Sequence, residues 1–160
     1  QKWAASEEAF TRFLSEFSDH ELWFQAQFGI GWSCENQGRH DGAIAAYTPV
    51  VERHKGPTAA RAQFQIGECY FAMKKLDLAV RELLKTDILF AYPEWSAASL
   101  YEAGRCLAES GKHADAKRQF EDVVRRFPDT NWAKLSKERI AHAAPALLPG
   151  KAPNVANQSR

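Results

Sequence analysis

The chain lacks several features that would assign a function directly. It has no marked charge of either sign, with 21 Lys and Arg against 20 Asp and Glu and a net charge of +1. Nucleic-acid binders usually carry a clear basic excess, so this balance gives no support for a nucleic-acid partner. A run of about 18 apolar residues is also missing, which argues against insertion into a membrane.

Motifs for catalysis and for metal binding are absent as well. The sequence has no glycine-rich phosphate loop and no nucleophile motif. Its carboxylate pairs, such as Glu7-Glu8, are typical of solvated helix faces. The five histidines show no metal-ligand spacing with one another or with the cysteines. We therefore predict no catalytic residue, no metal site and no cofactor, and hence a protein that is not an enzyme.

The three cysteines, an odd number, do not predict a disulfide framework. Cys34, Cys69 and Cys106 stand at nearly equivalent places in a repeated pattern. Equivalent residues of neighbouring packed helices lie roughly 8–10 Å apart, whereas a disulfide needs Cα atoms within about 7 Å. We interpret all three as small, buried apolar residues.

What the sequence does contain is a pattern that recurs three times. Its glycines are separated by 36 and 37 residues, at Gly31, Gly67 and Gly104. Each glycine is followed twelve residues later by an alanine and sixteen residues later by a large apolar residue: Ala43 and Tyr47, Ala79 and Leu83, Ala116 and Phe120. A fixed period of about 20–50 residues indicates stacked repeats, which usually bind partners along a surface and rarely catalyse reactions.

Helical spacing of the apolar residues predicts two helices in each repeat. The first helices are expected at 26–35, 59–73 and 96–108, and the second helices at 40–54, 76–89 and 112–127. Gly38 and Gly111 lie in the turns of the first and third pairs, where glycine accepts the left-handed conformation that ends a helix. Lys74 and Lys75 stand there in the second pair. Pro49 falls inside a predicted helix and should kink or shorten it.

The beginning of the chain matches only half of the pattern. Residues 2–17 align with residues 112–127, which predicts the second helix of a pair whose first helix is missing. We interpret the chain as a fragment of a longer array. Unless another helix or molecule covers it, this half repeat should expose an apolar edge at Phe10, Phe13 and Phe17.

The last part of the chain changes in composition. Residues 131–143 predict a closing helix whose outer face is polar, as terminal repeats need for solubility. This face carries Lys134, Lys137, Glu138 and Arg139. Pro, Gly, Asn, Gln and Ser are frequent beyond it, so we expect residues 144–160 to be a disordered tail or linker. Residues 1–143 are assigned to the helical array.

The recurrent residues resemble the tetratricopeptide repeat (TPR) family over about residues 2–142. The resemblance rests on the glycine of the first helix, the glycine of the turn, and the alanine and large apolar residue of the second helix. Glycine is expected opposite alanine because the two helices of a pair cross closely. The sequence departs from the family where Gln27, Gln63 and Leu100 replace an early tryptophan, and its period exceeds the usual length of about 34 residues.

The resemblance implies an all-α, right-handed solenoid of about three full repeats, with an N-terminal half repeat and a C-terminal capping helix. It also implies a scaffold for protein–protein interaction. The alternative is a structural or regulatory segment of a larger enzyme or transport and assembly complex whose chemistry lies elsewhere. The segments AQFQIGECYF and AKLSKERI are similar in style to bacterial cell-envelope TPR proteins, which implies a location in the periplasm or envelope.

In this family the first helices line a concave face, and one stripe of each helix should point into it. These stripes are Gln25, Phe28, Trp32 and Glu35; Arg61, Phe64, Glu68 and Phe71; and Ala98, Tyr101, Arg105 and Ala108. Aromatic anchors among mixed charges suit an extended peptide or a helix, so we predict a protein or peptide partner. The aromatics Phe28, Phe64 and Tyr101 are equally compatible with packing between neighbouring helices. The sequence leaves both roles open.

Two further modes of association can be compared. TPR domains that clamp a C-terminal carboxylate use Lys, Asn and Arg at these levels, where only Arg105 is comparable in this chain. We therefore do not expect a clamp for chaperone tails.

Self-association through the N-terminal half repeat is a separate alternative, because a second copy would cover its apolar edge.

Overall fold

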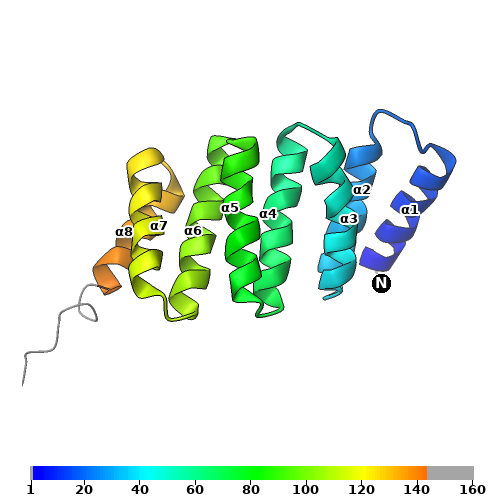
Figure 1. Ribbon diagram of the computed structural model, residues 1–160. Helices are drawn as coiled ribbons and strands as arrows, with labels where there is room; N and C mark the ends of the chain where they lie inside the picture. The colour runs from blue at the N-terminus through cyan, green and yellow to red at the C-terminus, as the bar shows by residue number, and fades with distance from the viewer. Residues whose placement is uncertain (1, 144–160) are drawn as a thin grey trace, which may run out of the picture.

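The computed structural model describes residues 2–143, which form eight α-helices in a single row (Figure 1). The helices are α1 (Lys2–Glu16), α2 (Trp23–Glu35), α3 (His40–Arg53), α4 (Pro57–Ala72), α5 (Leu76–Phe90), α6 (Pro93–Glu109), α7 (His113–Arg126) and α8 (Asn131–Ala143). This range contains no strand, so the predicted all-α class is confirmed. The predicted tail, residues 144–160, lies outside the described residues.

The order of contacts explains the curvature of the row. Each helix packs against the next one along the chain, and α2, α4, α6 and α8 also contact one another in sequence. Within residues 2–143, no such contact joins α1, α3, α5 and α7 to one another. The first helices of the pairs are therefore closer together than the second helices, and they line the concave face of a solenoid.

The turns within the pairs depend on left-handed backbone conformations. Gly38 and Gly111 have φ of 72° and 78°, which confirms their predicted role. The equivalent residue of the second pair is Lys74, with φ of 59°. A side chain in this conformation costs roughly 1–2 kcal/mol, which the other interactions of the middle pair have to offset.

The recurrent glycines lie where the two helices of each pair cross. A Cβ atom added there would lie within 2.6 Å of a large side chain: Gly31 against Tyr47, Gly67 against Leu83, and Gly104 against Phe120. The expectation that glycine faces the alanine was therefore wrong in detail. The large residue four positions after the alanine fills the space above the glycine. This contact explains why the large residue follows the glycine at a spacing of sixteen residues.

Several smaller predictions can be compared with the structure. Cys34, Cys69 and Cys106 are buried free thiols, as expected. Pro49 does not shorten its helix, because α3 spans 14 residues, as does the equivalent α7. At the start of α8, the Thr130 hydroxyl accepts a hydrogen bond from a backbone N–H at 3.2 Å. Among the helices of residues 2–143, none is long and apolar enough to cross a membrane.

Candidate functional site

The concave face, formed by α2, α4, α6 and α8, changes in accessibility along the array. On α2, Gln25 is exposed, and the other three predicted residues, Phe28, Trp32 and Glu35, are half-buried. The predicted residues of α4 are also half-buried: Arg61, Phe64, Glu68 and Phe71. On α6, Ala98 and Tyr101 are buried, whereas Arg105 and Ala108 remain partly accessible. Among the predicted residues, those of α2 and α4 are therefore more accessible to a partner than those of α6.

An aromatic cluster surrounds Arg61 at this open end. The Arg61 guanidinium carbon lies 4.8 Å from the ring centroid of Phe28, 5.4 Å from that of Trp32 and 5.9 Å from that of Trp95. Trp95 in turn packs on Phe64, with ring centroids 5.6 Å apart. Arg61 forms no ion pair with any residue in the range 2–143. Stacked cations of this kind contribute about 0.5–2 kcal/mol each, so the rings and the guanidinium hold one another in place.

Tyr101 illustrates the other role that the sequence left open. Only 6% of its surface is exposed. Its ring packs between Phe120, at 5.6 Å, and Trp132 of the next first helix, at 5.3 Å. Its aromatic surface is used between helices, which leaves little for a partner.

Glu35 connects two repeats. Its carboxylate accepts hydrogen bonds from the Tyr47 hydroxyl at 2.8 Å and from the side-chain amide of Gln65 at 2.9 Å. These partners belong to α3 and α4, respectively. Because its acceptors are already used within the chain, Glu35 stabilises the array more than it offers a contact to a ligand.

Glu68 lies in the middle of the concave face, and part of its carboxyl group has no hydrogen-bond partner among residues 2–143. Its Oε1 atom makes no hydrogen bond within the described chain. Burial raises the pKa of Glu68 to about 7, and the neighbouring carboxylate of Glu102 adds to the shift, which the positive charge of Arg105 opposes. Near neutral pH, therefore, Glu68 is partly protonated.

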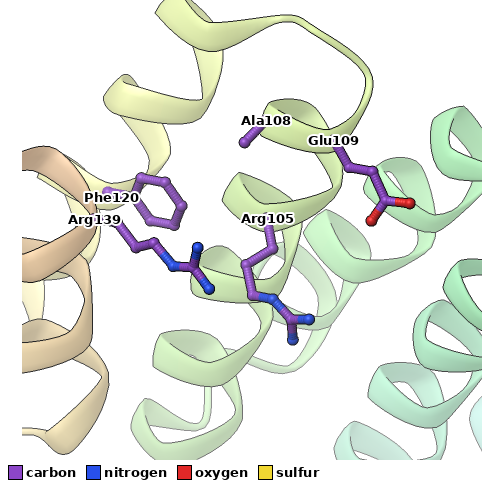
Figure 2. Close-up of a pocket in the computed structure, with 5 residues that line it drawn as sticks. All are labelled: Arg105, Ala108, Glu109, Phe120 and Arg139. Atoms are coloured by element: carbon purple, nitrogen blue, oxygen red, sulfur yellow. The ribbon is translucent and has the colours of Figure 1, made fainter. Parts of the chain in front are cut away.

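A cavity lies near the C-terminal end of the concave face, where α6, α7 and α8 meet. It has a volume of about 260 Å³ and is lined by Arg105, Ala108, Glu109, Phe120 and Arg139. Figure 2 shows the Arg139 guanidinium near the Phe120 ring, whereas the Arg105 guanidinium extends away from that ring, where it lies 5.2 Å from the ring centroid of Phe71. Arg105 also donates a hydrogen bond of 2.5 Å to Glu102.

Arg139 and Trp95 were not among the predicted partner-binding residues. The sequence placed Arg139 on the polar outer face of the closing helix, and its side chain is indeed exposed; the structure adds that it lines the cavity together with Arg105. Trp95 lies in the first turn of α6, six residues before Tyr101. The only sequence signal that could have identified Trp95 is the recurrence of aromatic residues in the first helices.

The predicted N-terminal edge is partly covered. Phe17 is 51% exposed, but Phe10 and Phe13 are half-buried. The ring of Phe10 packs over Gly29 of α2. A shallow apolar cavity of about 350 Å³ remains between α1 and α2, and Leu22 contributes to it.

Glu7 attaches the half repeat to the rest of the array. It accepts a hydrogen bond from Gln37 at 2.9 Å and pairs with Arg39 in the turn after α2. The hydrogen bond from Gln37 and the charge of Arg39 outweigh desolvation and lower the pKa of Glu7. Among residues 2–143, no three His, Cys, Asp or Glu side chains come together as a metal site would require.

Comparison with protein families assigns the chain to a class. Models described as tetratricopeptide repeat match residues 1–48 and 35–88, and another such model matches residues 98–130. The chain belongs to the tetratricopeptide repeat family, as the resemblance predicted. Repeats of this kind generally form modules for protein–protein interaction.

Solved structures of low sequence identity share the fold. The crystal structure of MamA is 18% identical, with a TM-score of 0.71, over 90% of this chain and 78% of that one. A putative kinesin light chain from Podosopora anserina, with nearly identical TPR-like repeats, is 19% identical with a TM-score of 0.69 over the same shares. At these identities the likeness shows the fold alone. A search of curated proteins gives no significant match.

Proposed function

We propose that the chain is a non-enzymatic interaction module that binds an extended peptide or a helix of a partner protein along its concave face. The observation that supports this most is the aromatic cluster around Arg61. Trp32 and Phe28 keep part of their surface accessible there, next to a guanidinium group without a carboxylate partner. Tryptophan, tyrosine and arginine are the residues that most often dominate binding energy at protein interfaces.

The shape of the face favours a linear partner. α2, α4, α6 and α8 stand side by side, so a groove that follows them crosses the helices rather than running along one of them. A peptide in this groove would meet the aromatic cluster at α2 and α4 and the arginine cavity at α6 and α8. Several separate anchor points of this kind suit a peptide or a helix better than a compact small molecule.

A second candidate is a structural or regulatory segment of a larger enzyme or transport complex. The shallow apolar cavity between α1 and α2 and the exposed Phe17 beside it support this role, because another helix or a second copy of the chain would bury them. The bacterial cell envelope remains the proposed location, and it rests on the sequence resemblance.

The concave-face proposal is tested with random linear peptides displayed on phage and selected on the protein. Affinities of the selected peptides are then measured for wild type, Trp32→Ala and Trp3→Ala. Trp3 is an exposed tryptophan of α1, so it provides a matched control away from the concave face. We expect Trp32→Ala to weaken binding by about tenfold or more and Trp3→Ala to leave it unchanged. Equal affinities of wild type and Trp32→Ala would contradict the proposal.

A further inference from the structure

The cavity between α6 and α8 brings two arginines from different helices into one space. Arg105 extends from α6 and Arg139 from α8, and both line the cavity together with Phe120 (Figure 2). Each guanidinium carries five N–H donors in a planar arrangement that matches a carboxylate. Arg105 uses part of this capacity on Glu102, whereas both terminal Nη groups of Arg139 have no hydrogen-bond partner within residues 2–143.

The two arginines of this cavity differ in their partners within the described chain. Glu102 is hydrogen-bonded to Arg105, and Glu109 pairs with Lys74 at 2.8 Å. Arg139 forms no ion pair with any other residue between 2 and 143, and its Nε atom reaches only the Tyr101 hydroxyl, at 3.5 Å. The positive charge of Arg139 also acts on Glu102, which thus faces two guanidinium groups. The carboxyl group of Glu68 also interacts with Arg105, so Arg139, whose side chain is exposed, is the arginine of this cavity that has no ion-pair partner within residues 2–143.

We propose that this cavity selects an acidic side chain, Asp or Glu, of the peptide bound on the concave face. This inference rests on the proposed function and adds the chemistry of the partner. A single carboxylate matches the single charge of the unpaired Arg139, whereas a phosphate group would bring about −2. The Ala108 methyl group and the Phe120 ring give the methylene groups of such a side chain an apolar surface, and the volume of about 260 Å³ accommodates it.

The position of the cavity relative to the aromatic cluster predicts which kinds of residue a bound peptide carries at its two contact points. The aromatic cluster lies at α2 and α4, and the cavity lies at the other end of the concave face. A partner segment that spans both would place an apolar or aromatic residue at the first and an acidic residue at the second. A basic residue at the second position would meet two guanidinium groups and be rejected.

The test repeats the phage selection on wild type, Arg139→Gln, Arg139→Glu and Lys134→Gln. Lys134 is an exposed lysine of α8 that does not line this cavity, so it is a control for lost charge. We expect Asp and Glu to be enriched at one position with wild type and Lys134→Gln. The enrichment should disappear with Arg139→Gln and change to Lys or Arg with Arg139→Glu. Replacing the acidic residue of a selected peptide by its amide should weaken binding about tenfold.

The outcomes separate this inference from the proposed function. Peptides that need Trp32 but show no acidic preference would overturn the inference and leave the proposed function intact. The same holds if the acidic preference survives in both Arg139 variants. If no peptide binds, or if binding is independent of Trp32, both fail. Circular dichroism of each variant checks that a lost preference does not come from unfolding.

Discussion

The crossings inside the helix pairs are alike in all three repeats, whereas the concave face differs from one repeat to the next. In each pair a glycine of the first helix meets a large side chain of the second. At one equivalent level of the concave face, the three repeats carry Trp32, Glu68 and Arg105. The contact between the glycine and the large side chain recurs because the two helices of every pair pack against each other in the same way. The second set of residues is free to vary, and that freedom makes the concave face the place to look for a partner.

The largest expected effect concerns the repeated crossing. Leu83 has 0% exposure and lies against Gly67, so Leu83→Ala should leave a cavity and reduce the free energy of unfolding by about 2–5 kcal/mol. Leu89→Ala is the matched control, because Leu89 belongs to the same helix and is 59% exposed. Urea denaturation measures both variants. Similar losses for the two would contradict the role given to the crossing.

A smaller effect should appear on the concave face as a dependence on pH. Burial raises the pKa of Glu68 from 4.5 to about 7, so the folded state holds the proton more tightly than the unfolded state. The free energy of unfolding of wild type, relative to Glu68→Gln, should therefore be highest below pH 4.5 and fall as the pH rises to about 7. The decrease is expected to be about 3 kcal/mol at most.

The measurement is urea denaturation of both proteins across this pH range, with Glu8→Gln as a control. Glu8 is an exposed carboxylate of α1, outside the concave face, and its replacement controls for the loss of one acidic side chain. The groups that face Glu68 are Glu102, Arg105 and Glu35, and all three remain in the Glu68→Gln variant. Parallel profiles of wild type and Glu68→Gln would show that Glu68 is not perturbed.

The smallest effect is expected at two exposed aliphatic residues near the end of α5. Ile88 and Leu89 are 75% and 59% exposed, and the equivalent positions of the other repeats carry charged residues: Glu52 and Arg53, and Arg125 and Arg126. The double variant Ile88→Glu, Leu89→Arg should change the free energy of unfolding by no more than about 0.5 kcal/mol. A loss above this, or an altered molecular mass in light scattering, would show that another surface covers these side chains.

The sequence predicted the repeated part of the fold well because its signals are local. The turn glycines, the buried cysteines and the three helix pairs all follow from spacing that each repeat contains within itself. The alanine was chosen as the partner of the glycine because spacing alone does not show which side chain of the second helix fills the gap. The ring of Tyr47 fills it in the first repeat.

The concave face was harder to predict because it depends on how neighbouring repeats are oriented. Tyr101 is buried by Trp132, which comes from the next first helix. Arg139 is exposed on the closing helix as the sequence predicted, but its place in a cavity with Arg105 depends on how α6 and α8 are oriented. Arg61 was correctly placed in a stripe, but its aromatic neighbours became evident only from the structure.

The central claim is that the concave face, with its varied residues, binds the partner. It is tested most directly by titrating a phage-selected peptide into the isotopically labelled protein and mapping the backbone amide shifts by NMR. We predict that the changes follow α2, α4, α6 and α8 and are largest near Trp32, Arg61 and Arg139. Changes confined to α3, α5 and α7 would place the binding surface on the convex side and contradict the claim.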